Sequence, residues 1–509
     1  ITLCSHAQYG NEWIDYSQKY VSFPITESGI HRIDYQVLEQ SIIPINAINH
    51  NQIQLFGRNK QLPIYLELNG DNTFDPGDYI LFNTDKNDGW NDSALYVDPN
   101  TVASPYINLY NDTIHYFLSW STSVNNLRFT DQSAANYTQY TASDYVWSLF
   151  KQNYNQAYIE GESVQSTLSS SFYVAGEGYG LGQFNGVNGY QLSLGESTSF
   201  TYIGANSLMA RFIGLVTTTA SASVSPFGSP NHHTRFKINN NIVFDETGFG
   251  CFQFRADVEV PVSELSNSTP VTWEIVGDLP VATQYQAITH YSIRYPRQPF
   301  FGNENFADFD LPNSNSSFSR LDVTPIANTN NPIYFSFGST FRRLIPELVN
   351  GKHVVLVPRN DTNNDTRIIS YNPNSARIIT QLTTVNGTGT FTNYHASNNK
   401  KAYIIIYPTP LQAGAQAYKN YRQSMSGGSY NVVTANVDEL YFQYGGGVKK
   451  HISAIRNFAN SIYQNSTEKP EALLLLGKGI SNERFRFNSA NYQENMVPRF
   501  GIPASDLLI

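Results

Sequence analysis

Cysteine is scarce in this sequence, which contains only Cys4 and Cys251. Two cysteines cannot build a disulfide framework, and no C-x-x-C pair is present to hold zinc. The H-E-x-x-H, G-x-S-x-G and Walker A patterns are missing as well. The sequence therefore lacks the signatures of a zinc peptidase, an α/β-hydrolase and a P-loop nucleotide-binding protein, and it predicts no cofactor apart from a candidate calcium loop described below.

Charge and long apolar runs are also limited. Charged residues make up 14% of the chain, and 32 Lys and Arg face 41 Asp and Glu, which gives a formal net charge of −9. Non-specific nucleic-acid binding needs a basic surface, so this balance argues against a nucleic-acid partner. No run of 18 or more apolar residues is present, and we therefore expect no membrane-spanning helix.

Aromatic residues, by contrast, are abundant, at 14% of the chain with 34 Tyr and 31 Phe. Aromatic and β-branched side chains fit the half-buried faces of sheets, and this composition is typical of β-rich extracellular proteins. A chain of 509 residues has room for three or four domains. The composition thus predicts a multidomain, mainly β protein.

The first residues resemble the end of a signal peptide. Ser5-x-Ala7 has the small residues that precede a cleavage site, so residues 1–7 are expected to be a signal-peptide remnant. Cys4 could instead be a lipoprotein cysteine, but that signal prefers a small residue before the cysteine and Leu3 is large. Both alternatives predict an exported protein.

Short alternating strands separated by turn residues run through the first 400 residues. We predict a β domain over residues 8–125, a β-sandwich over 126–299 and a small immunoglobulin-like β domain over 300–399. Asn239 and Asn240 can adopt positive φ and predict the turn of a hairpin. The clearest predicted strands are residues 20–25, 29–35, 53–56, 333–337 and 353–357.

A glycine-rich loop over residues 69–78 carries three carboxylates, those of Asp71, Asp75 and Asp78. Calcium prefers several oxygen ligands on a flexible turn, so these residues are a candidate calcium site. The spacing of an EF-hand is absent. Asx-type turns between strands explain the same residues without a metal, and both interpretations stay open at this point.

Residues 400–509 show a different pattern, in which strands and helices alternate. Apolar runs predict strands, and apolar residues at helical spacing predict helices. This succession predicts a parallel α/β sheet, in which ligands bind beyond the carboxyl ends of the strands. The predicted strands are residues 403–407, 430–435 and 473–476, and the predicted helices are residues 413–423 and 448–463.

Short sequence blocks follow one another in this segment at residues 401–406, 432–433, 440–447, 454–458, 470–477 and 497–506. Their order and spacing resemble the opening of the gingipain-type cysteine peptidases of peptidase family C25. One departure is Lys478, because members of that family usually carry an acidic residue after the glycine. Blocks at residues 13–16, 29–33, 75–82 and 87–89 resemble the N-terminal region of the type IX secretion system sortase-like proteins of the same family.

The resemblance implies that residues 400–509 are the first part of a caspase-like α/β peptidase domain. It implies an exported cysteine peptidase, either a protease or a sortase-like transpeptidase, that is secreted, at the cell surface or outer membrane-associated. The catalytic His and Cys would lie beyond residue 509, so no catalytic residue can be named in this sequence. The implied partners are a protein substrate and an outer-membrane secretion component or barrel.

Two other functions remain open. A non-catalytic exported adhesin or secretion-machinery component could use the same scaffold, since a fold does not determine a function. The β-sandwiches and aromatic residues also suggest a carbohydrate-binding surface protein. The sequence beyond residue 509 would distinguish these from an enzyme, because a His and then a Cys, each just after an apolar strand, would favour the peptidase.

Cys251 is the first candidate nucleophile if Cys4 is removed with a signal peptide. It lies in an expected alternating strand of the sandwich, and we interpret it as a buried structural cysteine. The neighbouring pair His232 and His233 is expected at the surface, beside a hairpin.

Several other residues are candidates for a structural or functional role. Gly477 and Gly479 are expected to turn the chain sharply after a buried strand, with a role in shaping a substrate face as the alternative. Asp506 is a weak candidate for either a structural or an active-cleft residue. The tripeptides that begin at Asp92 and Asp112 resemble the short O-glycosylation motif of exported Bacteroidota proteins, and we take them only as a hint about compartment.

Overall fold

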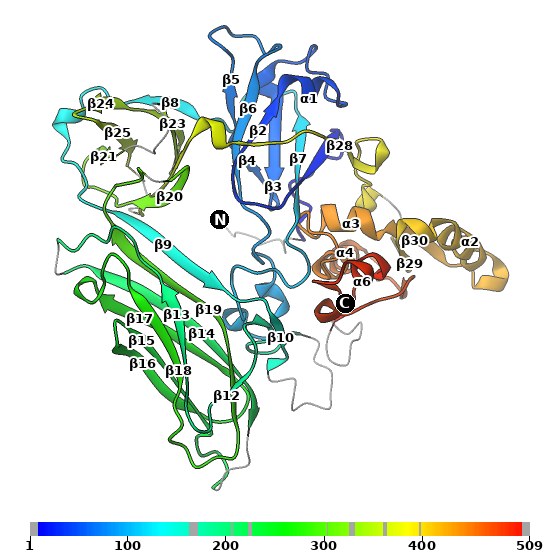
Figure 1. Cartoon of the computed structure of the whole chain (residues 1–509). Coiled ribbons are helices and arrows are strands. Elements are labelled where there is room, and N and C mark those ends of the chain that lie inside the picture. Colours follow the sequence, from blue (N-terminus) through cyan, green and yellow to red (C-terminus); the bar gives the residue numbers. More distant parts are fainter. Residues whose placement is uncertain are drawn as a thin grey trace.

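The computed structural model describes residues 9–161, 172–204, 207–221, 226–302, 304–324, 331–359, 364–396 and 399–500. The predicted leader, Cys4 and Asp506 lie outside these residues. In Figure 1 one β-rich part lies at the top, two further β-rich parts lie on the left, and a smaller α/β part extends to the right. The expected fold class, a multidomain mainly β chain that ends in the start of a caspase-like α/β domain, is confirmed.

The N-terminal part consists of two packed sheets with strand orders β28-β1-β7-β3-β4 and β27-β2-β6-β5. Their inner faces share one apolar core, in which Phe23, Ile33 and Phe82 are almost completely buried. Two short strands come from far along the chain, since β27 pairs with β2 and β28 pairs with β1. The strands are β1 Tyr20–Ile25, β2 Gly29–Asp34, β3 Ile53–Gly57, β4 Lys60–Leu62, β5 Tyr65–Glu67, β6 Tyr79–Thr84, β7 Ile114–Trp120, β27 Arg377–Ile378 and β28 Thr383–Thr384, with helix α1 Tyr35–Glu39 after β2.

A long β-sandwich forms the lower part of the molecule in Figure 1. The sheet β13-β18-β15-β16 packs against the half of a ten-stranded sheet that has the order β17-β14-β19-β9. The predicted hairpin is confirmed, because β15 and β16 pair and the turn residues Asn239 and Asn240 have φ of 48° and 70°. The strands are β9 Val146–Asn153, β13 Tyr190–Glu196, β14 Met209–Ser221, β15 His232–Ile238, β16 Asn241–Gly248, β17 Gln253–Pro261, β18 Pro270–Ile275 and β19 Gln284–Arg297.

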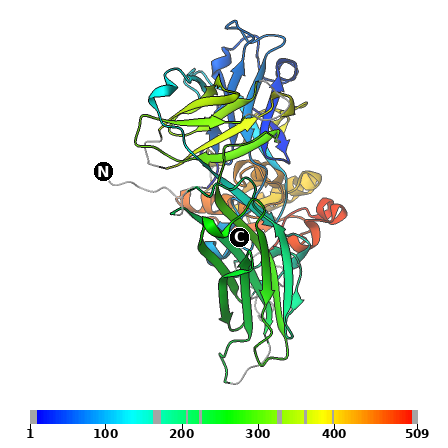
Figure 2. The same ribbon diagram turned by 60° about the vertical axis from the view of Figure 1, so that its left-hand side comes forward.

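The other half of the ten-stranded sheet, β20-β26-β22-β23-β8, covers a small sheet of order β21-β25-β24 (Figure 2). The two halves are joined by one bridge, between Trp147 of β9 and Asp310 of β20. Phe309, Leu321 and Val355 lie in the core between the two sheets. The strands are β8 Thr130–Ser133, β20 Phe306–Leu311, β21 Phe318–Val323, β22 Ile333–Phe337, β23 Phe341–Ile345, β24 Glu347–Val349, β25 Lys352–Pro358 and β26 Thr366–Tyr371.

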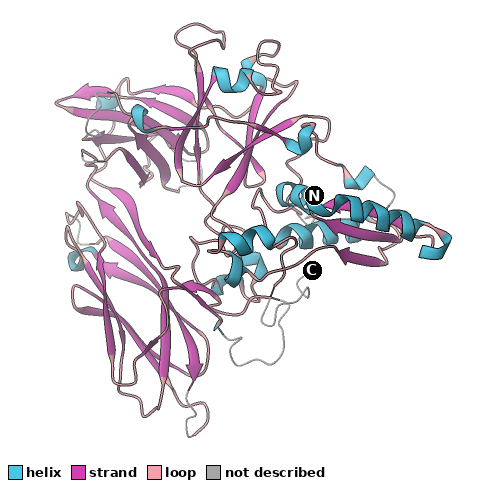
Figure 3. Ribbon diagram, turned by 45° about the vertical axis from the view of Figure 1, so that its right-hand side comes forward, coloured by secondary structure: helices cyan, strands magenta, loops and turns pink. Residues whose placement is uncertain are grey.

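The C-terminal part contains a parallel sheet of order β30-β29-β31 between helices (Figure 3). Ile405 faces helix α2, and Ile404 and Ile406 face helices α3 and α4, because successive strand side chains point to opposite faces. The elements are β29 Ala402–Tyr407, α2 Gln412–Gln423, β30 Asn431–Asn436, α3 Val437–Gln443, α4 Ser453–Asn465, β31 Ala472–Leu475, α5 Asn482–Phe485 and α6 Ser489–Glu494.

One predicted boundary in this part is wrong. The sequence pattern places the start of the second helix at residue 448, whereas α4 begins at Ser453. Gly446, Gly447 and Lys450 all have positive φ, of 64°, 85° and 64°, and this conformation cannot continue a right-handed helix.

Among the described residues, no helix is long and apolar enough to cross a membrane.

Candidate functional site

The carboxyl ends of the three parallel strands meet at one edge of the C-terminal sheet, which is where ligands bind in such sheets. The Asp438 carboxylate accepts hydrogen bonds there from the Thr409 N–H at 3.3 Å and the Thr409 hydroxyl at 2.7 Å. Asn436 caps α3 by accepting the Asp438 N–H at 2.9 Å. A hollow of about 520 Å³ opens beside these residues, lined by Tyr407, Thr409, Pro410, Gln412, Ala413, Gln416 and Thr434.

The turn after β31 depends on glycine. Gly477 has a φ of 137°, and a Cβ atom at this position would lie 2.9 Å from the Cβ of Met496. The next carbonyl, that of Lys478, accepts the Met496 N–H at 2.9 Å. The sharp turn expected at Gly477 is therefore confirmed, but the preceding strand β31 is not buried as expected, since Leu473 is 37% exposed. Lys478 forms an ion pair of 2.6 Å with Glu494, and both side chains are more than half exposed.

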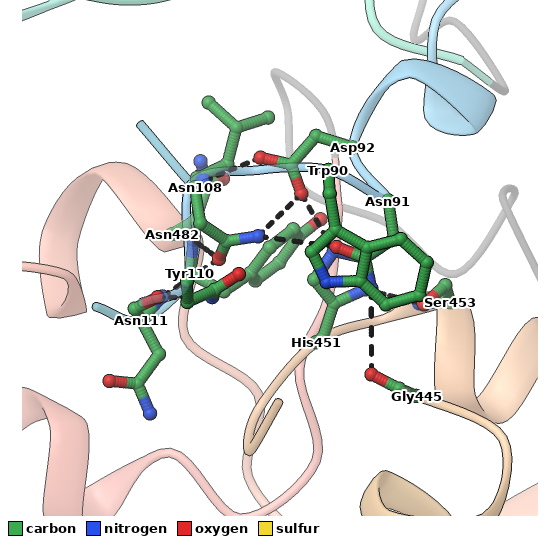
Figure 4. A network of polar contacts seen from close by, with 12 residues as sticks. Trp90, Asn91, Asp92, Asn108, Tyr110, Asn111, Gly445, His451, Ser453 and Asn482 are labelled. Carbon is green, nitrogen blue, oxygen red and sulfur yellow. Dashed lines mark hydrogen bonds and ion pairs between the residues drawn. The ribbon is translucent and has the colours of Figure 1, made fainter. Parts of the chain in front are cut away.

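A buried polar network joins the N-terminal part to the start of α4 (Figure 4). His451 Nε2 lies 2.7 Å from Asp92 Oδ1, and both side chains are excluded from solvent. His451 Nδ1 accepts the Ser453 N–H at 3.2 Å and lies 2.5 Å from the Ser453 hydroxyl. Because Nδ1 is an acceptor, the ring proton is on Nε2 and is donated to Asp92.

Asp92 is held by two further donors. Asn108 Nδ2 donates to Oδ1 at 2.7 Å, and the Leu109 N–H donates to Oδ2 at 2.8 Å. Burial raises the pKa of Asp92, and the hydrogen bond from His451 acts in the opposite direction. Ser453, His451 and Asp92 are in contact one after another, as in a Ser-His-Asp catalytic triad. Ser453, however, is the first residue of α4, and its N–H donates to His451. The network therefore fixes the start of the helix to the N-terminal part.

A second buried group lies close by, where the sandwich meets the C-terminal segment. Glu177 accepts the Tyr158 hydroxyl at 2.7 Å and the Val174 N–H at 3.1 Å. Burial among tyrosines raises the pKa of Glu177 to about 8. Nearby, the Tyr173 hydroxyl lies 2.6 Å from the Tyr110 hydroxyl and donates to Asn482 Oδ1 at 3.2 Å. Three distant stretches of the chain thus share one aromatic and polar junction.

The residues singled out around Cys251 are placed differently from the prediction. Cys251 is half-buried in a bend between β16 and β17, not in a strand. His232 and His233 are buried, so their expected surface position is wrong. The reason is that β15 is flanked by β16 and β18 in its sheet, and His233 is held between Asp245 at 2.6 Å and Asp278 at 2.8 Å.

The acidic loop over residues 69–78 forms turns. Asp71 accepts the Thr73 N–H at 2.8 Å, and Asp78 accepts the Asp75 N–H at 2.9 Å and Asn69 Nδ2 at 2.7 Å. These are the Asx-type contacts that the sequence allowed. Among the described residues, no group of three or more His, Cys, Asp or Glu is arranged to hold a metal ion.

Neither Asp92 nor His451 was a predicted network residue. Asp92 was singled out only as part of a short glycosylation-like tripeptide, and its carboxylate is inside the protein. Asp112, which begins the second such tripeptide, pairs with Arg486. A contact across 359 residues leaves no signal in the local pattern of one sequence.

Comparison with known proteins gives a family-model match to part of the chain and a structural match to most of it. Residues 396–508 match the model of peptidase family C25. No curated protein matches the chain. The structure is similar to the crystal structure of dimeric latent PorU from Porphyromonas gingivalis, with a TM-score of 0.60 and 14% identity over 95% of this chain and 44% of that protein. The chain thus spans less than half of the length of that protein.

Two other solved structures match this chain with TM-scores well below 0.5. One is the glycoside hydrolase domain of Endo-D from Streptococcus pneumoniae R6, with a TM-score of 0.15 and 9% identity over 47% of this chain and 43% of that chain. The other is the VP2 subviral particle of infectious bursal disease virus, with a TM-score of 0.18 and 11% identity over 69% of this chain and 78% of that chain. Scores this low carry no argument about fold or function. The C25 match and the PorU-like fold confirm the resemblance seen in the sequence.

Proposed function

We propose, from the C25 match and the PorU-like fold, that this chain is the N-terminal portion of an exported cysteine peptidase of the gingipain or type IX sortase-like kind. The observation that carries the proposal is the position of the matched segment. It covers β29 to α6, a parallel sheet whose strands end at one edge beside a polar hollow. A cysteine and a histidine on strands that continue this sheet would complete a catalytic site at that edge.

The chemistry of such a site follows from the family. A cysteine thiolate attacks the carbonyl carbon of a peptide bond, and a histidine takes and then returns the proton. Backbone N–H groups stabilise the oxyanion. Water completes hydrolysis, whereas an amine acceptor completes a sortase-like transpeptidation. We place both catalytic residues after residue 509 and assign no catalytic role to Cys251 or to Ser453.

The proposal includes a location and partners. A β-rich, aromatic-rich chain with few charges is typical of exported proteins, and we infer action at the cell surface, at the outer membrane or in the medium. The substrates would be proteins, and an outer-membrane secretion component is the proposed assembly partner. A non-catalytic secretion component is the competing proposal, favoured by Lys478, which stands where an acidic residue is usual in the family.

An intact mass of the natural protein, with peptide mapping beyond residue 509, is the first test. A mass well above 57.1 kDa, with a His and a Cys on the next strands, would support the peptidase. Replacement of that Cys by Ala should then abolish cleavage or transpeptidation of a protein substrate and leave the thermal unfolding midpoint unchanged. A natural chain without such a pair would establish the non-catalytic alternative.

A further inference from the structure

The ten-stranded sheet divides between β9 and β20. β9 pairs with β19 along its full length, from Val146 to Asn153. Its other edge meets β20 through one bridge only, Trp147 to Asp310, although β20 pairs with β26 along its whole length. Beyond that bridge the facing edges of two strands carry no strand partner among the described residues. Such edges present N–H and C=O groups that another strand can bind.

A cavity of about 620 Å³ lies at this division, where the three β-rich parts meet. We call it the junction cleft. Its walls come from β9, β19, β20 and β26 and from the segments just before β2 and just after β6. It is lined by Thr26, Glu27, Ser28, Asp85, Lys86, Trp147, Ser148, Leu149, Lys151, Arg294, Phe306, Asp308, Phe309, Asp310, Arg367 and Arg377.

The floor of the junction cleft has both apolar and cationic side chains. Trp147, Leu149 and Lys151 alternate along β9 and therefore share one face of the strand. Leu149 is 45% exposed. The Arg294 guanidinium lies 4.5 Å from the centre of the Trp147 ring. An extended chain placed along β9 would cover these exposed apolar atoms.

The charged side chains of the junction cleft indicate which kind of peptide it can bind. Each acidic residue of the junction cleft already has an arginine partner, although three arginines serve the four carboxylates: Asp308 pairs with Arg367 and Asp310 with Arg294. Glu27 pairs with Arg377, and Asp85 with Arg367. Lys86 and Lys151 form no ion pair among the described residues, and Lys151 instead lies 4.5 Å from the centre of the Tyr106 ring. Two cations without carboxylate partners favour an anionic ligand.

We propose that the junction cleft binds an extended, acidic peptide segment of a partner protein by strand addition to the free edge of β9. Main-chain hydrogen bonds to β9 would supply affinity, as in other cases of β-augmentation. Carboxylates of the peptide would pair with Lys86 and Lys151, and its apolar residues would contact Trp147 and Leu149. The site lies on the β-rich parts and needs no catalytic residue, so it stands or falls independently of the peptidase proposal.

Binding can be measured on the full chain by fluorescence anisotropy. The probe is a fluorescein-labelled peptide of about eight residues in which Glu and Val alternate, the usual length of a strand. A Lys–Val peptide of the same length is the charge-reversed control. We expect saturable binding of the acidic peptide only, and a loss of about tenfold or more in affinity when Lys86→Glu and Lys151→Glu are combined.

Matched variants separate this site from general attraction to cations. Lys352→Glu changes an exposed lysine of β25 that does not line the junction cleft, and it should leave affinity unchanged. The double charge reversal should in turn gain affinity for the Lys–Val peptide. Hydrogen exchange supplies an independent readout, because strand addition must protect those backbone amides of residues 148–153 that point away from β19.

Several results would overturn the proposal. These are no saturable binding of the acidic peptide, equal binding of both peptides, unchanged affinity in the double variant, or binding without added protection in β9. The last result would indicate adsorption to surface charges rather than an added strand.

Discussion

Asp92 is the residue on which the contact between the N-terminal part and α4 depends most directly. Its carboxylate accepts from His451, Asn108 and the Leu109 N–H, and it is fully buried. Truncation would leave a buried imidazole N–H and two further donors without an acceptor. We expect Asp92→Ala to lower the free energy of unfolding by about 3 kcal/mol, the usual cost of breaking a buried polar pair.

Urea unfolding of Asp92→Ala and of His451→Leu would check this expectation. Glu494→Ala is the control, because it removes an exposed ion pair with Lys478, and pairs of that kind contribute little. The two buried-site changes made together should cost less than the sum of the single changes, since each disrupts the same contact. Additive costs would contradict a direct coupling between Asp92 and His451.

Glu177 should make the stability of the protein depend on pH. Its pKa in the folded protein is raised to about 8, against 4.5 for an ordinary glutamate. The folded state therefore holds a proton that the unfolded state releases between pH 4.5 and 8, and stability falls as the pH rises through that range. Well above pH 8 this loss is complete, and it is about 5 kcal/mol.

Glu177→Gln keeps the size and polarity of the side chain and cannot ionise. We expect its urea unfolding midpoint to be nearly the same at pH 5 and pH 8.5, whereas that of the unchanged protein falls more between these two values. The variant should be the more stable protein at pH 8.5. An equal fall in both proteins would show that other groups, and not Glu177, cause the dependence.

Two glycines of the C-terminal part should respond to alanine in opposite ways. Gly477 has a φ of 137°, and a Cβ atom there would press on Met496. Gly414 lies within α2, with nothing near the place of a Cβ atom. We expect Gly477→Ala to destabilise by about 1–3 kcal/mol and Gly414→Ala to stabilise by about 0.5–1 kcal/mol.

Thermal unfolding midpoints of the two variants would test this pair of expectations with one measurement. A Gly477→Ala midpoint at or above that of the unchanged protein would mean that the turn after β31 relaxes without cost. The comparison is matched, because both substitutions add one methyl group within the same α/β part.

Local sequence patterns predict a strand, helix or turn well where residues close in sequence determine it. The apolar runs of β29, β30 and β31 and the Asn-rich turn of β15 and β16 are examples, since each is decided by neighbours in sequence. The start of α4 is mispredicted because Lys450 adopts a left-handed conformation that its residue type does not require. The surface position of His233 is mispredicted because the local pattern does not show that Asp245 and Asp278 enclose its ring.

The network around Asp92 shows why the sequence predicts the fold better than it predicts the candidate site. Periodicity finds buried faces, but it does not say which face meets which. Asp92 meets His451, and Tyr173 meets Asn482, only because three separate stretches converge. By contrast, the resemblance to family C25 rested on consecutive blocks in one segment, and a single sequence was sufficient to find it.

The arrangement of the whole molecule depends on the junction around Tyr173. This side chain is fully buried, contacts Phe500 with ring centres 4.4 Å apart, and hydrogen-bonds with Tyr110 and Asn482. It thus connects the sandwich side of the molecule with both the N-terminal part and the C-terminal segment. Tyr173→Ala would leave a cavity at this meeting point, while the cores of the separate parts contain none of the lost contacts.

We therefore expect Tyr173→Ala to loosen the contact between parts without unfolding them. Hydrogen exchange should accelerate in residues 95–111 and 480–500 and stay unchanged in the hairpin β15–β16, whose contacts lie within the sandwich. Tyr173→Phe removes only the hydroxyl and should give a smaller effect, because the ring still fills the space. Faster exchange throughout the molecule would instead show that the parts unfold together, and that Tyr173 supports a single cooperative unit.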